Sequence, residues 1–434
     1  MKRQLNEIYE NKAPPKPTSE GIDVDDWRMV DSDDDRFEVP NPKLNVSFLL
    51  LKRYGCNHLD IFFRLYPINL MKKVWEERKN GGWNCGSGGR RINHGVFSER
   101  SILTLMAVKL HILAIHQTHT STGPKHRSSL RNDIVEALDY FRARNGEEDI
   151  TVGINPIETF LSSFLLSHEY YDEVSDNFRS FIRSLGEFVS GDEKLSPFTG
   201  ESSDVRHVPG KEPSIGLWMY MLCGLIDENT PYVIDIKMWQ SEVHTQEKER
   251  VSHTIMRWAS IVEELQITDR ACILAVDSYY LDNPGRDRLL DSGVKFVASV
   301  NKTRFKPLVQ QVEPHVQAEG KWAAVYNEET NELFVHVWDA NKDIGKKYVL
   351  GNAMEYIEGE GTPANQKPLY DLYKLTFRAV DKFNQMAHGK DWTHKHGGYK
   401  HSGSAGAEDE YCLVTMLLNS CVLHRSRMGY IVVV

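Results

Sequence analysis

Three aspartates in the second half of the chain stand where carboxylates could carry out chemistry on a phosphodiester bond. Asp192 ends a strand-like segment, Asp277 follows the apolar run Cys272–Val276, and Asp381 lies in a late helix-like segment. Carboxylates that converge from distant segments suit a pair of divalent cations. Two such ions ~3.5–4 Å apart can activate an attacking oxygen and stabilise a leaving oxygen at phosphorus. Mg²⁺ and Mn²⁺ prefer hard oxygen ligands and keep several waters, so few protein carboxylates are needed.

The run before Asp277 is typical of a strand that is buried on both faces. Burying an unpaired carboxylate is unfavourable, so an aspartate at the end of such a strand is expected to have a functional or a structural role. One role is functional, because open α/β sheets bind ligands at the carboxyl ends of their strands. The other is structural: a plain βαβ unit whose aspartate caps the following helix. The residues alone leave both interpretations open.

The elements around the aspartates follow from their hydrophobic patterns. Alternating or continuous apolar runs predict strands, and apolar residues at helical spacing predict helices. Gly293 is placed to end a helix. The predicted order is a strand over 188–195, a hairpin of strands over 215–226 and 232–239, a helix over 245–265, a strand over 272–276, a helix over 285–292, a strand over 294–300 and a helix over 368–386.

The N-terminal 42 residues are predicted to be a disordered acidic tail. The stretch from Glu20 to Glu38 holds nine acidic and two basic residues, and such charge blocks cannot bury enough apolar surface to fold. Trp27 and Phe37 are the two side chains of the tail that could dock on another surface. A solvated tail is the preferred interpretation.

Residues 43–185 are predicted to form a mostly helical domain, because apolar residues recur at helical spacing through most of it. Its predicted helices include 44–75, 101–116, 129–144, 156–166 and 178–185. Residues 306–367 are less regular and are predicted to be an insertion, with a strand pair at 333–338 and 347–350. A final apolar helix is expected over 408–427. The predicted division is therefore 1–42, 43–185, a core over 186–305, the insertion 306–367 and the returning core 368–434.

Composition narrows the class of protein. A chain of 434 residues suggests two or three domains. It shows no apolar run of membrane-spanning length and no N-terminal signal-like segment, so we expect an intracellular, soluble protein with no membrane partner. The six cysteines form no CxxC pair, which argues against zinc ribbons and disulfide frameworks. The net charge of −9 neither supports nor excludes DNA binding, because the N-terminal tail carries most of it.

Two other segments hold residues with possible binding roles. Gly81–Arg91 is rich in glycine and ends in two arginines, but it lacks the Lys-Ser/Thr pair of a phosphate-binding loop. We interpret it as a flexible linker. The histidines between His388 and His401 have no cysteine at ligand spacing and sit among glycines, so they are interpreted as a surface loop.

The local sequences around the three aspartates resemble the motifs of the piggyBac transposase family. Gly191–Gly200 resembles the first acidic motif, an Asp-Glu pair with Phe and Gly a few residues on. Ala275–Lys302 resembles the second, in which an aspartate and two aromatic residues precede a helix, a strand and a basic turn. Val380–Met386 resembles the third, Val-Asp-x-x-Asp-Gln, and the predicted hairpin fits between the first two. The resemblance covers roughly residues 45–425.

The resemblance implies an RNase H-like, mixed-sheet α/β catalytic core that cuts and joins DNA with Mg²⁺ or Mn²⁺. Asp192, Asp277 and Asp381 would be both the catalytic residues and the metal ligands. Glu193 is not assigned, because alternation along a strand turns it to the other face. The helical block would correspond to a DNA-binding and dimerisation region. DNA and a second copy of the chain are then the expected partners, in the nucleus, with no small-molecule substrate.

Three departures from the family pattern favour a competing function, that of an inactive transposon-derived remnant which binds DNA or protein. Asn384 stands where the family often has another aspartate, and Ser278 replaces the usual asparagine. The chain also ends without the cysteine-rich, zinc-binding tail that grips transposon ends in the family. We therefore expect weak, salt-sensitive DNA binding through phosphate contacts. The expected contacts are Arg90, Arg91, Lys125–Arg131 and Lys302–Lys306.

Overall fold

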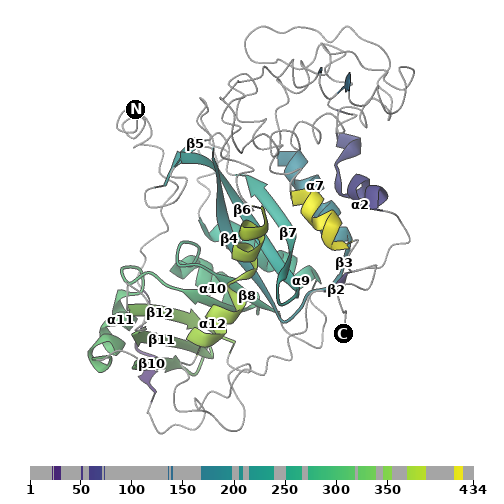
Figure 1. The fold of residues 1–434 in the computed structure, drawn as a ribbon. Coiled ribbons are helices and arrows are strands. Elements are labelled where there is room, and N and C mark those ends of the chain that lie inside the picture. The colour runs from purple at the N-terminus through teal and green to yellow at the C-terminus, as the bar shows by residue number, and fades with distance from the viewer. Residues whose placement is uncertain are drawn as a thin grey trace, which may run out of the picture.

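The fold is built around one large mixed sheet. The computed structural model describes residues 22, 24–30, 50–51, 58–70, 73, 135, 138–139, 168–197, 205–208, 215–238, 251–265, 272–317, 321–338, 346–353, 369–387 and 415–423. In this part of the chain ten strands form the main sheet, and two short strands form a second one. Helices lie on both faces of the main sheet (Figure 1). The expected mixed α/β class is confirmed.

Five strands make up the centre of the sheet, in the spatial order β7-β6-β4-β8-β9. The first three pair antiparallel, whereas β8 runs parallel to both β4 and β9. Every residue of β8 is buried, as its uninterrupted apolar run predicted. The bounds are β4 Phe188–Pro197, β6 Ile215–Asp227, β7 Thr230–Met238, β8 Ile273–Val276 and β9 Lys295–Ser299. Each of these strands was predicted from the sequence.

The segment predicted as an insertion continues this sheet. Strand β12 pairs antiparallel with β9, and β11 and β10 follow in antiparallel order. The predicted strand pair corresponds to β11 Glu332–Trp338 and β12 Lys346–Gly351, while β10 Trp322–Asn327 was not predicted. At the other end β5 Val205–His207 pairs with the beginning of β6. Helix α11 Lys306–Val312 and the 3₁₀ turn η3 Glu313–His315 connect β9 to β10.

The last strand of the sheet comes from the predicted disordered tail, and for these residues that prediction is wrong. β1 Trp27–Met29 pairs antiparallel with β10. The Trp27 side chain is buried, and the guanidinium of Arg286 lies 6.0 Å from the centre of its ring. Burial of Trp27 and backbone pairing with the open edge of β10 stabilise this strand, despite the acidic charge around it. Phe37 lies outside the described residues.

Helices cover both faces of the centre of the sheet. On strand β4, Ser190 contacts α13 on one face, and Gly191 contacts the Trp258 ring of α9 on the other. A Cβ atom on Gly191 would lie 2.3 Å from that indole, so this close packing requires glycine. Helix α12 contacts β8 and β9 (Figure 1). The bounds are α9 Val251–Leu265, α10 Asn283–Asp291, α12 Tyr370–Thr376 and α13 Ala379–Ala387.

Three helix predictions need correction. Within the predicted helix 44–75, Leu50 and Leu51 form a strand, and helix α2 begins only at His58. The segment 178–185 is not one helix: α7 His168–Ser180 ends first, and β3 Ile182–Ser184 pairs with β2 Leu50–Leu51. Its alternating burial, with Arg183 exposed between two buried residues, is that of a strand. The predicted helix 368–386 is divided into α12 and α13 at Phe377 and Arg378, where the backbone leaves the helical conformation.

The predicted helical domain is described only in part. Helix α2 His58–Leu65 packs against α7, which itself packs on β7. Residues 135, 138 and 139 are helical, as are residues 415–423 within the predicted final helix. The predicted helices at 101–116 and 156–166, the glycine-rich segment 81–91 and the histidine segment 388–401 lie outside the described residues. No helix within the described ranges is long and apolar enough to cross a membrane.

Candidate active site beside β4 at the end of β8

The two strand aspartates lie at equivalent positions on neighbouring strands. Gly191 of β4 is paired with Val276 of β8 in parallel register, and Asp192 and Asp277 are the next residues of each chain segment. The carboxyl ends of adjacent parallel strands meet at one edge of a sheet. The prediction that these two aspartates lie on adjacent strands is confirmed, but only Asp277 follows the end of its strand, because β4 continues past Asp192 to Pro197.

Asp381 is brought to the same edge by a contact between β4 and α13. The backbone N–H groups of Ala379 and Val380 donate to the Ser190 hydroxyl at 3.2 and 3.3 Å. Ser190 thus serves the first turn of α13 as a side-chain cap supplied by the sheet. Because side chains alternate along a strand, Asp192 shares the face of Ser190 and of α13. Asp381 lies in the first turn of that helix.

Glu193 lies on the opposite face of β4, as alternation predicted. It is buried, and its negative charge helps to raise the pKa values of Tyr279 and Tyr280, in both cases after burial as the larger cause. Tyr280 also packs against Trp258, which lies on the α9 face, with ring centres 4.9 Å apart. Glu193 therefore belongs to an aromatic layer beneath the sheet and remains unassigned.

The loop that carries Asp277 is held by neighbouring donors. One oxygen of Asp277 (Oδ1) accepts from the backbone N–H of Ser278 at 2.6 Å and from the Ser299 hydroxyl at 2.7 Å. Arg304 donates to three carbonyls of the following loop, those of Ser278, Tyr279 and Leu281. Arg304, predicted as a phosphate contact, is therefore occupied within the protein. Lys302 likewise pairs with Glu313 at 2.7 Å.

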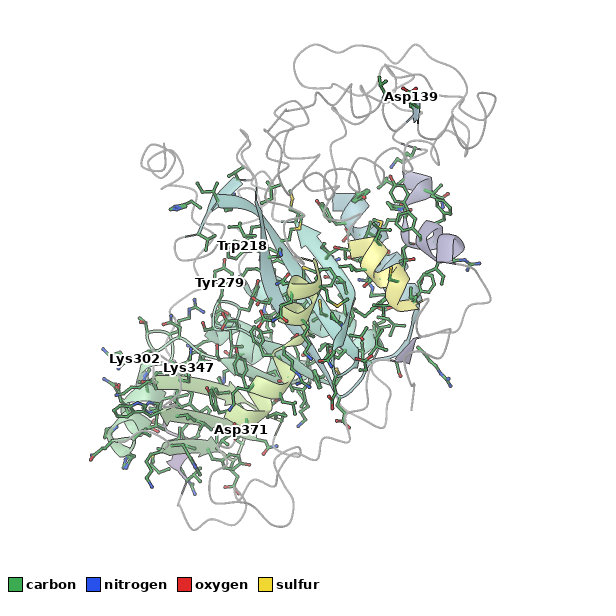
Figure 2. The ribbon with its side chains drawn as sticks, in the orientation of Figure 1. Asp139, Trp218, Tyr279, Lys302, Lys347 and Asp371 are labelled. Carbon is green, nitrogen blue, oxygen red and sulfur yellow. The ribbon has the colours of Figure 1, made fainter. Side chains whose placement is uncertain are left out.

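The aromatic residues after Asp277 support this loop from below. Tyr279 packs against Trp218 of β6, with ring centres 5.5 Å apart (Figure 2). Tyr280 is fully buried. The helix that follows is capped by Asp282, whose carboxylate accepts from the N–H of Gly285, and Gly293 follows its end with a φ of 70°. The helix-capping alternative for Asp277 is therefore wrong, because Asp282 fills that role.

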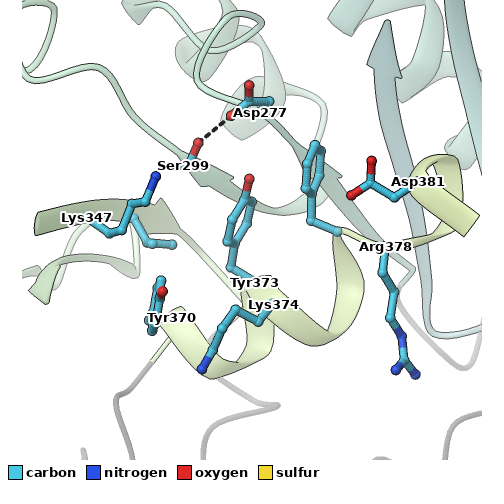
Figure 3. A pocket seen from close by; sticks show the side chains of 10 residues that line it. Asp277, Ser299, Lys347, Tyr370, Tyr373, Lys374, Arg378 and Asp381 are labelled. Carbon is cyan, nitrogen blue, oxygen red and sulfur yellow. Dashed lines mark hydrogen bonds between the residues drawn. The ribbon is translucent and has the colours of Figure 1, made fainter. Parts of the chain in front are cut away.

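Asp277 and Asp381 line one cavity of about 350 Å³. Tyr373 of α12 lines it too, and Figure 3 shows its hydroxyl directed toward Asp277. Burial raises the pKa of Tyr373 above its usual range, and the negative charges of Asp277, Asp192 and Asp381 raise it further. A hydrogen bond with Ser299 acts in the opposite direction. The charges of all three aspartates therefore act on the Tyr373 phenol, although only Asp277 and Asp381 line the cavity with it.

Divalent-cation binding can be tested against the donor atoms. No group of three acidic, histidine or cysteine side chains in the described parts of the chain is arranged to hold a metal ion. Like-charged carboxylates repel one another, which opposes such a grouping. The amide oxygen of Asn384, three residues beyond Asp381, is buried and accepts no hydrogen bond. Carboxylate and amide oxygens are the donor types that Mg²⁺ and Mn²⁺ prefer.

Sequence reasoning missed three residues that position the aspartates: Ser190, Ser299 and Tyr373. Tyr373 and the two serines look ordinary in the sequence, and their roles come from contacts with distant segments. Ser299 alone had a local signal, since it ends a predicted strand next to the basic turn. The positions of Asp192, Asp277 and Asp381 themselves required no such contact to be singled out.

Seven chains of solved structures match this protein. The chain matches a cryo-EM structure of a piggyBac transposase synaptic complex with hairpin DNA, at a TM-score of 0.59 and 12% sequence identity. The match covers 88% of this chain and 78% of that one. No family model and no curated protein sequence matches the chain. The likeness shows a shared fold, and it agrees with the motif resemblance at that level.

Proposed function

We propose that this protein is a piggyBac-type transposase-like enzyme that cleaves DNA and transfers the resulting strand. The observation that carries the proposal is the register between Gly191 and Val276, which sets Asp192 and Asp277 side by side while Ser190 draws α13 and Asp381 to the same edge. The strand order β7-β6-β4-β8-β9, antiparallel in its first three strands and parallel in the rest, supports an RNase H-like core. The structural match to a transposase–DNA complex supports DNA as the substrate.

In this proposal Asp192, Asp277 and Asp381 hold Mg²⁺ or Mn²⁺, with Asn384 as a neutral oxygen donor nearby. Bound there, the cations would activate the attacking oxygen and stabilise the leaving oxygen of the phosphodiester. Ser299 and the Ser278 N–H hold one oxygen of Asp277, which fixes the direction of the other. Tyr373, whose pKa is raised by burial and by the neighbouring carboxylates, contributes a neutral hydroxyl to the lining of the cavity.

The test combines metal binding with cleavage. Mn²⁺ should raise the melting temperature of the wild-type protein and not that of Asp277→Asn, because binding to the native state alone stabilises it. Wild-type protein with Mn²⁺ should nick supercoiled DNA, and Asp192→Asn, Asp277→Asn and Asp381→Asn should each abolish nicking. Asp371→Asn is the matched control: this aspartate lies on α12 and pairs with Lys374 at 2.7 Å. An equal Mn²⁺ shift in wild type and Asp277→Asn would contradict the proposed site.

A second candidate function is DNA binding without cleavage. It is favoured by Asn384, which lacks the charge of an aspartate, and by the open arrangement of the acidic side chains within the described residues. The same experiment separates the two functions. A protein that binds DNA, shows no Mn²⁺ shift and nicks no DNA would have kept the fold and lost the chemistry.

A further inference from the structure

Two positively charged side chains that line the aspartate cavity, Lys347 and Arg378, form no ion pair with any residue that the structure describes. The cavity is lined by Lys347, Lys374 and Arg378 as well as by Asp277 and Asp381. Lys374 pairs with Asp371 at 2.7 Å and lies over the ring of Tyr370. Among the residues that the structure describes, the buried Nε of Arg378 has no acceptor.

Arg378 stands where its charge is electrostatically unfavourable. Its carbonyl accepts from the N–H of Lys382 at 3.0 Å, so it occupies the N-terminal boundary of α13. The N-terminus of a helix carries a partial positive charge and favours anions over cations. Lys382 adds a second positive charge one turn away, and its pKa is lowered first by burial and then by the charge of Arg378. An anion bound beside Arg378 would relieve both repulsions.

Lys347 stands on the other side of the cavity. It belongs to β12, next to β9 and the residues that end it, whereas Arg378 belongs to the junction of α12 and α13. Figure 3 shows Lys347 near Ser299 on one side of Tyr373, and Arg378 on the other side, below Asp381, with its guanidinium directed away from Asp277. A single small anion would reach one of the two cations, whereas a chain of phosphates crossing the cavity would reach both.

We propose that Lys347 and Arg378 bind two phosphates of a DNA strand, one on each side of the phosphate placed at the aspartates. This inference rests on the proposed function, since it takes the aspartate edge as the reacting centre. The two cations are positioning residues: they align the strand by charge and read no base. They replace Lys302–Lys306 as the expected phosphate contacts near the site, because Lys302 and Arg304 are already occupied.

The experiment measures DNA affinity in an Asp277→Asn background, in which cleavage is absent and one like charge is removed. Lys347→Gln and Arg378→Gln are added singly and together, and binding of a fluorescein-labelled duplex is followed by anisotropy over a range of salt. Losing one phosphate contact should weaken binding about five- to tenfold near 0.1 M salt and reduce the slope of log K against log salt by about 1. The double variant should lose about twice that slope. Lys374→Gln, in the same cavity but ion-paired, should change neither quantity by as much.

Three outcomes would overturn the inference: unchanged affinity and slope in both variants, an equal loss in Lys374→Gln, or no DNA binding by the parent protein. The first would mean that Lys347 and Arg378 only balance the aspartate charges, and their removal would then lower the melting temperature instead. Failure of the proposed function is a separate result. If the wild-type protein nicks no DNA but the variants lose affinity as predicted, the phosphate contacts stand and the proposed cleavage activity fails. If the wild-type protein nicks DNA but the variants bind as tightly as the parent, the cleavage activity stands and the phosphate contacts fail.

Discussion

The central sheet positions Asp235 and Asp277 in opposite electrostatic environments. Asp235 of β7 is fully buried, and both of its oxygens accept from Arg257, at 2.9 and 2.8 Å, with Arg179 at 3.2 Å. Asp277 accepts instead from neutral donors, the Ser278 N–H and the Ser299 hydroxyl. Among the described side chains no lysine or arginine pairs with Asp277.

The difference separates a structural carboxylate from one available for chemistry. Burial alone would raise the pKa of Asp235, but the hydrogen bonds and charge of Arg257, with the charge of Arg179, outweigh it and hold that pKa below its usual value. A carboxylate whose negative charge is already balanced by two guanidinium groups attracts a further cation only weakly. At Asp277 neutral donors fix the orientation and leave the charge, which is the arrangement a metal ligand needs.

The largest expected effect on stability comes from removing the ion-pair partner of Asp235, the structural carboxylate. Arg257→Met removes the main partner of Asp235 and should lower the free energy of unfolding by about 3 kcal/mol, because a buried charge is left with only Arg179. Chemical denaturation measures the loss. Replacing both partners, Asp235→Asn with Arg257→Met, should cost less because no buried charge remains. Asp277→Asn should change metal-free stability by less than about 1 kcal/mol, since an amide oxygen can accept the same two bonds. A loss as large as that of Arg257→Met would show that Asp277 is structural.

A smaller effect is expected in the pH dependence of stability. The folded-state pKa of Asp235 is lowered, so its stabilising contribution is present above the unfolded pKa of about 4 and is lost as pH falls through the folded value. In Arg257→Met the folded pKa rises toward the value that burial favours. The stability gap between wild type and variant should therefore narrow between neutral pH and pH 4, as measured by denaturation at each pH. A constant gap would mean that Arg257 acts through packing rather than through charge.

The parts of this fold that the sequence predicted are those governed by local patterns. The strand-like segment around Asp192 and the apolar run before Asp277 predicted two strands, and the two carboxylates lie side by side because these strands pair in parallel register. The hairpin of β6 and β7 and the helix ended by Gly293 were predicted on similar grounds. Asp381 was predicted as a site residue from the motif resemblance and from its position on a late helix. The residues around it did not otherwise indicate a role.

The parts that failed depend on pairings between distant residues. Nothing local to Trp27 indicates that an open strand edge about 300 residues later will accept it. The spacing of apolar residues over 178–185 fits a helix as well as a strand, and pairing with Leu50–Leu51 decides between them. Ser190 and Ala379 meet across 189 residues. Such contacts are set by how the sheet assembles, so the precise support of the site was beyond a reading of one sequence.

The smallest expected effect tests whether Ser190 helps to position the proposed metal-binding aspartates. Ser190→Ala removes the acceptor of two N–H groups at the start of α13, and the loss of such a cap should cost about 1 kcal/mol of stability. If Ser190 also sets Asp381 against Asp192, the variant should lose part of its Mn²⁺-dependent stabilisation in addition. Melting with and without Mn²⁺ separates the two contributions, because a cap alone lowers both melting temperatures equally. Ser292→Ala, which removes a hydroxyl that bonds only the Leu289 carbonyl at the end of α10, is the control and should leave the Mn²⁺ shift unchanged. Equal Mn²⁺ shifts in wild type and Ser190→Ala would reduce Ser190 to a helix cap, and Asp381 would then reach the site through the packing of α13 alone.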